Sequence, residues 1–268
     1  MRATSFNFCL CPNEAPSRKY FYFEITTRNL TLFTLLSACL TQPALFMGQD
    51  AKTQSSDEVL QLSEPADFNT AIYYRNKLEY SLEVGALPIN IPFIFNVFVG
   101  GDYSQNPLHY TLVPIFPSLR WHMGAVNGPW ILRGNSDLTL SLSFTAIPRG
   151  PETRYGAFDL GARRNFVHRN WRVAPYFELR AGAGFIDAKG PEGVRYAQGQ
   201  DFTFTLMAGS GVRYNFSPRY SMEMGAGYIH VSNGYLSEPK YPNNGINVCG
   251  PMVGFNMRLG KPKQKSRQ

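Results

Sequence analysis

Cysteine is scarce in this chain of 268 residues, and its spacing suits neither cross-linking nor metal binding. Cys9, Cys11 and Cys39 lie near the N-terminus, and Cys249 stands alone near the C-terminus. This spacing forms neither a disulfide framework nor a cysteine–histidine metal motif. The chain also has only four histidines and few clustered acidic residues, so the sequence predicts no metal site.

Long apolar runs are missing as well. After residue 50 no stretch of about 18 apolar residues occurs, so transmembrane helices are not expected in the main body. Charged residues make up only 17% of the chain, whereas it contains 20 Phe, 15 Tyr and 24 Gly, a composition that favours an all-β architecture. The formal net charge of +7 comes from scattered basic residues and a basic tail, so nucleic acid is not an expected partner.

From about residue 71 onward, apolar and polar residues alternate with a period of two. Such alternation places the two sets of side chains on opposite faces of a β-strand. The clearest case is the segment Trp171–Phe185, in which Arg172, Glu178 and Arg180 fall between apolar or small residues. The eight segments predicted as strands are 78–86, 109–122, 137–145, 155–166, 171–185, 202–213, 219–232 and 246–259.

Charged residues in these segments share the parity opposite to the apolar side chains. In a soluble β-sandwich they would face water, whereas in a small membrane barrel they would form a paired polar interior, with the apolar face toward lipid. The residues concerned are Glu83, Glu178, Arg180, Arg213, Glu223 and Arg258.

Loop lengths separate these two architectures. The second and third, fourth and fifth, and sixth and seventh segments are expected to be joined by short turns, such as 168–170 and 215–218. The first and second, fifth and sixth, and seventh and eighth are joined by long polar loops. Short turns at one end and long loops at the other are typical of outer-membrane barrels. We therefore predict an all-β fold, an eight-stranded antiparallel outer-membrane β-barrel.

The N-terminal residues have the character of an export segment. Basic residues precede a short apolar stretch, Leu30–Leu40, as in a secretory signal peptide. We expect cleavage between Gln42 and Ala51, while Leu36–Cys39 also fits a lipoprotein cleavage box and leaves lipidation of Cys39 open. The expected organisation is an export segment at 1–50, a flexible lead-in at 51–70, a β-barrel domain at 71–260 and a basic tail at 261–268.

The stretch Tyr228–Gly234 holds the residues best suited to chemistry. His230 and Ser232 are two residues apart, so on a strand they project from the same face as base and nucleophile. That face is the apolar one, where stability would favour an aliphatic or aromatic residue over a polar pair. On the last predicted strand, Asn247 has the same outward parity and is placed to accept the imidazole N–H.

His230-Val-Ser232-Asn233-Gly, followed by Pro242-Asn243-Asn244-Gly245-Ile246 and a closing apolar strand, resembles the outer-membrane lipid A 3-O-deacylase family, also called acyloxyacyl hydrolases. The resemblance covers about residues 70–260. It implies an eight-stranded barrel that removes an ester-linked acyl chain from lipid A at a site on the lipid-facing exterior. It also implies His230 as base, Ser232 as nucleophile, and Asn233 and Asn243 as residues linked to the oxyanion.

One position departs from the family pattern. The acidic member of the family's triad falls where this chain has Asn247. An Asn can orient a catalytic His, as in Cys-His-Asn proteases, but it stabilises an imidazolium less than a carboxylate does. Three alternatives stay open: Asn247 orients His230, Glu238 bends back to do so, or the site is impaired.

The sequence thus predicts a serine esterase of the cell outer membrane with a Ser232–His230–Asn247 triad and with lipopolysaccharide of the outer leaflet as substrate. Gly182–Gly184 and Gly225–Gly227 lie within strands and do not predict a dinucleotide loop, so no cofactor is expected. A homodimer stays open. The alternative is a structural or adhesive barrel that kept the fold and lost the chemistry; Asn247 favours it, and the intact His-x-Ser-Asn motif disfavours it.

Overall fold

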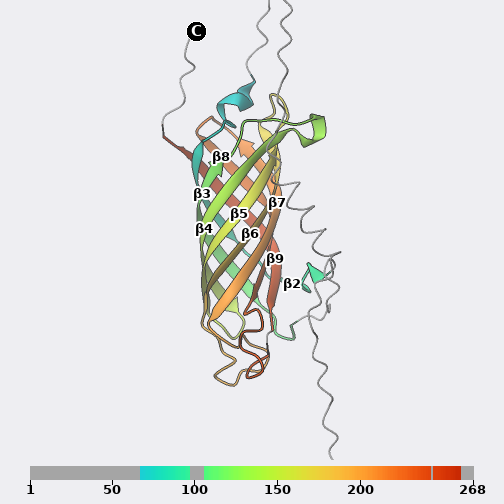
Figure 1. Cartoon of the computed structure of the whole chain (residues 1–268), viewed down its shortest axis with the longest axis vertical. Coiled ribbons are helices and arrows are strands. Elements are labelled where there is room, and N and C mark those ends of the chain that lie inside the picture. The colour runs from blue at the N-terminus through green and yellow to red at the C-terminus, as the bar shows by residue number, and fades with distance from the viewer. Residues whose placement is uncertain (1–66, 97–105, 243, 261–268) are drawn as a thin grey trace, which may run out of the picture.

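The computed structural model describes residues 67–96, 106–242 and 244–260. Its strands form one closed antiparallel barrel (Figure 1). Eight long strands follow one another around the wall, and β1 pairs with β9 to close it. The strands are β1 Leu78–Gly85, β2 Ile89–Asn90, β3 Thr111–His122, β4 Gly134–Arg149, β5 Arg154–Phe166, β6 Val173–Ile186, β7 Phe202–Asn215, β8 Tyr220–Ser232 and β9 Ile246–Leu259.

The predicted eight-stranded barrel is confirmed. The described residues also include two 3₁₀ turns, η1 Phe68–Ala71 and η2 Trp130–Leu132, and none of their helices is long and apolar enough to cross a membrane. The proposed export segment with Cys39, most of the lead-in, Asn243 and the basic tail lie outside the described residues.

Two details differ from the sequence-based expectation. β4 runs from Gly134 to Arg149, several residues beyond the predicted segment at each end, because polar residues such as Asn135 still pair their backbone with β5 although they interrupt the apolar alternation. The connection between β3 and β4 spans 123–133, holds η2 and is longer than the expected short turn. Periodicity marks where side chains alternate between faces, and backbone pairing extends past it.

The chain reverses direction so that two groups of connections lie at opposite ends of the barrel. Both η1 and the end of β9 lie at one end, at the top of Figure 1. The segments after β1, β4, β6 and β8 lie at the other end, and the loop 187–201 is one of the long connections there. We call this second end the loop end.

The outward face of the wall is apolar, as the alternation predicted. Phe144 on β4 and Met224 on β8 are more than half exposed, whereas the inward residues Ser143, Thr145 and Glu223 beside them are buried. A band of this kind is typical of the lipid-facing surface of membrane barrels. Further exposed members are Leu82, Ile115, Leu119, Leu140, Leu142, Phe158, Leu160, Phe177, Phe185, Phe204, Met222, Val253 and Phe255.

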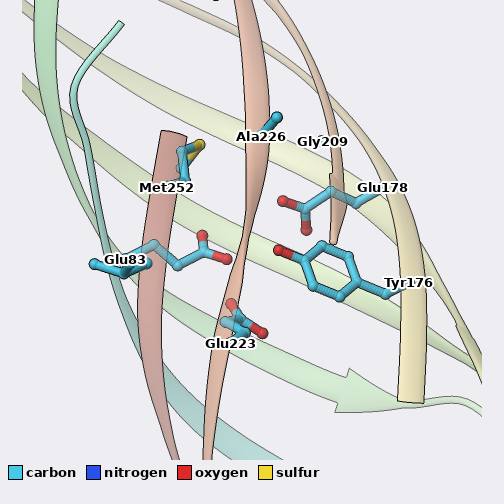
Figure 2. Close-up of a pocket in the computed structure, with 8 residues that line it drawn as sticks. Glu83, Tyr176, Glu178, Gly209, Glu223, Ala226 and Met252 are labelled. Carbon is cyan, nitrogen blue, oxygen red and sulfur yellow. The ribbon is translucent and has the colours of Figure 1, made fainter. Parts of the chain in front are cut away.

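Charged side chains fill the middle of the barrel. Figure 2 shows the carboxylates of Glu83, Glu178 and Glu223 turned toward one another from different strands. The cavity that these residues line measures only about 10 Å³, which is the space of about one water molecule. The interior at this level is therefore packed with side chains.

Three arginines balance these three glutamates. Glu223 accepts hydrogen bonds from Arg120 at 2.9 and 3.1 Å and from Arg163 at 2.5 and 3.2 Å. Arg120 and Arg180 also bind Glu83, and Arg163 binds Glu178 at 3.0 Å. We call these six residues the interior ion-pair network. It joins β1, β3, β5, β6 and β8 across the barrel.

Between the network and the loop end, the interior becomes apolar. Val231, Ile246 and Val248 are fully buried, and they belong to one cluster with residues from the opposite wall. Val231 and Ile229 have the inward parity of β8, so residues 230 and 232 must project outward from the same rigid stretch. The other buried members are Leu87, Tyr110, Leu112, Phe116, Ile147, Tyr155, Ile186, Ala188, Met207 and Met252.

Candidate active site

His230, Ser232 and Asn247 meet on the outside of the barrel near its loop end. His230 and Ser232 are among the last three residues of β8, and Asn247 is the second residue of β9. β8 and β9 are antiparallel, and His230 is the direct cross-strand partner of Asn247. Side chains directly opposite each other on neighbouring strands have their Cβ atoms about 5 Å apart, which is close enough for a hydrogen bond between them.

The three side chains form a continuous chain of hydrogen bonds. His230 Nε2 lies 2.9 Å from Ser232 Oγ, and His230 Nδ1 lies 2.8 Å from Asn247 Oδ1. Because an amide oxygen only accepts, Nδ1 carries the proton and Nε2 is left to accept the Ser232 hydroxyl. The arrangement is that of a nucleophile, a base and a group that orients the base.

The amide of Asn247 has a defined orientation. Its Nδ2 donates to the carbonyl of Gly245 at 3.2 Å, and its Oδ1 also accepts from the Tyr228 hydroxyl at 2.7 Å. Glu238, the alternative orienting residue, is exposed in the loop after β8, whereas Nδ1 of the imidazole contacts Asn247.

The two oxyanion candidates have different positions. Asn233 is fully buried at the end of β8, where Nδ2 donates to Ser237 Oγ at 2.7 Å and Oδ1 accepts from the Tyr235 backbone N–H at 3.1 Å. The side chain therefore helps to shape the loop that follows Ser232. Asn243 lies outside the described residues.

Two aromatic residues at the site were not predicted as site residues. The Phe93 ring packs on the imidazole of His230, with the ring centroids 4.2 Å apart, and Tyr228 contacts Asn247. Tyr228 projects to the same outward face as His230 and Asn247, so the alternation could have indicated it as a site residue. Phe93 lies in the segment after β2, which carries no periodic pattern, and only the folded chain brings it to His230.

Gly245 has a conformation that an alanine can adopt but a position that an alanine would crowd. A Cβ atom there would lie 2.8 Å from His230 Cε1 and 3.4 Å from Nδ1. We expect Gly245→Ala to displace the imidazole and lower kcat about tenfold, because small misplacements of catalytic groups have large effects on rate. Gly124→Ala, where a Cβ would meet nothing within 4 Å, is the control. Equal rates for both variants would show that the imidazole position is not critical.

The model of one protein family, described as lipid A 3-O-deacylase (PagL), matches residues 115–256, which hold β3 to β9 almost entirely. The match covers more than half of the chain and includes all three residues of the hydrogen-bonded chain. This protein belongs to the lipid A 3-O-deacylase family. As a family member with this barrel, it is an outer-membrane protein.

Solved structures give further similarities for this lipid A 3-O-deacylase family member. The outer-membrane enzyme PagL is 15% identical, with a TM-score of 0.42, and the match covers 67% of this chain and 98% of that one. Neisserial surface protein A is 14% identical with a TM-score of 0.35, covering 68% and 96%. OprG from Pseudomonas aeruginosa is 12% identical with a TM-score of 0.36, covering 71% and 99%. A comparison with curated proteins gave no match.

Proposed function

We propose that this protein is a serine esterase that removes an ester-linked acyl chain from the lipid A part of lipopolysaccharide. The observation that supports the proposal most strongly is the hydrogen-bonded order Ser232–His230–Asn247 on the lipid-facing wall. The family match covers these residues and supports the same chemistry. The proposal uses one chain, because all three side chains come from neighbouring strands of the same barrel.

The reaction proceeds through an acyl-enzyme. Ser232 Oγ attacks the ester carbonyl carbon while His230 Nε2 takes the hydroxyl proton, and Asn247 Oδ1 holds the other side of the imidazole. His230 then gives the proton to the departing sugar oxygen as the ester C–O bond breaks. A water molecule, deprotonated by His230, attacks the acyl-enzyme, and the fatty acid leaves as Ser232 regains its proton. No cofactor takes part in the proposed steps.

Negative charge develops on the carbonyl oxygen during each attack, and amide donors are expected to stabilise it. Asn233 and Asn243 are our proposed donors, from the positions that they share with the family motif. Asn233 follows Ser232 directly in the chain, so its backbone lies next to that of the nucleophile. Its side chain is engaged with Ser237 in the structure, so this role requires a change of partner on substrate binding.

The position of the site suits a substrate that arrives within the membrane. His230 and Ser232 continue the outward apolar face of β8, beyond Met224 and Ala226, and they lie near the loop end. With the loop end at the cell surface, as is usual for outer-membrane barrels, the site lies at the level of the outer leaflet. An acyl chain of lipopolysaccharide can then reach Ser232 laterally, without a deep pocket.

The test is incubation of the purified, refolded barrel with lipopolysaccharide, followed by mass spectrometry of the lipid A. The proposal expects a mass loss that equals one hydroxy-fatty acid, together with free fatty acid in the supernatant. Unchanged lipid A from a properly folded barrel, both in detergent and in bilayers, would contradict it.

The replacement of the family's acidic residue by Asn247 favours a second candidate function, a structural or adhesive barrel without activity. Asn247→Asp separates the two. In an enzyme whose Asn already orients His230, this carboxylate changes the rate moderately in either direction. In an impaired barrel, the substitution would create deacylation where the parent protein shows none.

A further inference from the structure

Tyr228 has an unusual environment for a residue on the outward face of the barrel. Its neighbours with the same parity, Met224 and Ala226, are exposed, whereas Tyr228 is only 5% exposed. The cover is the segment 91–96 after β2, which lies against the outside of the wall. The Phe95 ring packs near the Tyr228 ring, with the ring centroids 6.4 Å apart.

The Tyr228 hydroxyl is connected to the catalytic base through one atom. It donates to Asn247 Oδ1 at 2.7 Å, and the same oxygen lies 2.8 Å from His230 Nδ1. In the proposed mechanism, Tyr228 does not contact Ser232. Its effect on the reaction must pass through Asn247.

The direction of these hydrogen bonds follows from the groups that contact the two atoms of the Asn247 amide. A tyrosine hydroxyl has a single proton to donate, and the Tyr228 hydroxyl directs this proton at Asn247 Oδ1, 2.7 Å away. A backbone carbonyl can only accept, so the Asn247 atom that faces Gly245 is Nδ2. Both ends give the same result, with Oδ1 toward the imidazole.

The rotational orientation of the side chain matters more for an asparagine than for a carboxylate. Both oxygens of an aspartate or glutamate accept, so rotation by 180° changes nothing at the imidazole. The same rotation in Asn247 would present Nδ2 to His230 and favour the proton on Nε2. The imidazole could then no longer accept the Ser232 proton, and an imidazole held in the wrong tautomer is known to lower kcat by about 10⁴-fold in serine proteases.

We propose that Tyr228 is a positioning residue that fixes the amide of Asn247 and thereby the reactive tautomer of His230. The packing of Phe95 on Tyr228 makes the segment 91–96 part of the same arrangement, although this segment is remote from β8 and β9 in the sequence. The inference rests on the proposed esterase function for its effect on rate, whereas its effect on the tautomer does not depend on activity.

The first test is Tyr228→Phe, which removes the hydroxyl and keeps the ring against Phe95. We expect kcat to fall about 10- to 100-fold with little change in KM, in the range known for partners that orient a catalytic or metal-binding His. Tyr214→Phe on the outward face of β7 is the matched control, because its ring is half exposed to lipid. We expect this control to keep the parent rate.

The second test separates positioning from packing. In the Asn247→Asp background the residue has no N–H to misdirect, so we expect Tyr228→Phe to change kcat less than threefold there. The coupling between the two substitutions is then at least several-fold. An equal loss in both backgrounds would show that Tyr228 acts by packing alone and would overturn the inference.

A third measurement is independent of turnover. Nitrogen-15 shifts of labelled histidine report which ring nitrogen carries the proton, and we expect the Nδ1–H form of neutral His230 in the parent and a mixture of tautomers in Tyr228→Phe. If the parent does not deacylate lipid A but this shift occurs, the proposed function fails and the inference stands. If the parent is active and Tyr228→Phe changes neither kcat nor the tautomer, the inference alone fails.

Discussion

Ser232→Ala is expected to lower the rate of lipid A deacylation by about 10⁴- to 10⁶-fold, the loss seen when the nucleophile of a serine hydrolase is removed. Ser232 Oγ is the atom that forms the acyl-enzyme, and it is 2.9 Å from the nitrogen that takes its proton. The neighbouring side chains Val231 and Asn233 are buried independently of this hydroxyl, so the barrel should fold as before.

The measurement is the initial rate of fatty acid release from lipopolysaccharide, with Ser210→Ala as the matched control. Ser210 lies on β7, which pairs with β8, and is exposed on the same outward face. We expect the control to retain the parent rate. A Ser232→Ala protein that keeps a tenth or more of that rate would mean that another group is the nucleophile.

Glu223→Gln is expected to have the largest effect on stability, a loss of about 3–5 kcal/mol in the free energy of unfolding. The carboxylate of Glu223 accepts from Arg120, Arg163 and Asn256 in the closed interior. A neutral amide of the same shape leaves two buried guanidinium groups short of one negative charge. The cost of an unbalanced buried charge then exceeds the modest net contribution of an ordinary hydrogen bond.

Urea or guanidinium unfolding of the barrel in lipid vesicles measures this loss, and Ser221→Ala supplies the control. Ser221 is buried on the same strand and the same inward face, and its Oγ lacks a hydrogen-bond partner among the described residues. We expect its removal to leave stability unchanged or slightly higher. Equal midpoints for Glu223→Gln and the parent would show that the interior ion-pair network does not contribute to stability.

The site is attached to two paired strands whose inward side chains are buried. His230, Ser232 and Asn247 project outward from two paired strands, and Ile229, Val231, Ile246 and Val248 anchor the same strands in the buried cluster. Sites on strands hold their geometry more closely than sites on loops. A chain of hydrogen bonds between neighbouring strands can therefore persist without a deep cleft around it.

Much of the barrel could be predicted from the sequence because its two environments differ so strongly. Lipid outside and a packed polar interior force strict alternation, and this pattern placed Glu83, Arg180 and Glu223 inside and His230 outside. The pattern did not show which charged residues form ion pairs with one another. Which arginine meets which glutamate depends on the stagger of the strands around the barrel, and this stagger is a property of the whole closed sheet.

The candidate site could likewise be predicted in part. Parity placed His230, Ser232 and Asn247 on one face, and the antiparallel register of β8 and β9 brings His230 opposite Asn247. The contributions of Phe93 and Phe95 could not be predicted, because the segment after β2 has no periodic pattern and its position depends on packing against the finished wall. The orientation of the Asn247 amide likewise requires its hydrogen-bond partners.

Labelling with a fluorophosphonate, followed by peptide mass spectrometry, tests most directly whether Ser232 is a nucleophile activated by His230. Such a reagent reacts with an activated serine and leaves ordinary serines unmodified. We expect one phosphonate on the peptide that contains Ser232, and no adduct in folded His230→Ala. Deacylation of lipid A by a protein that takes up no label at Ser232, or labelling that persists without His230, would contradict the account.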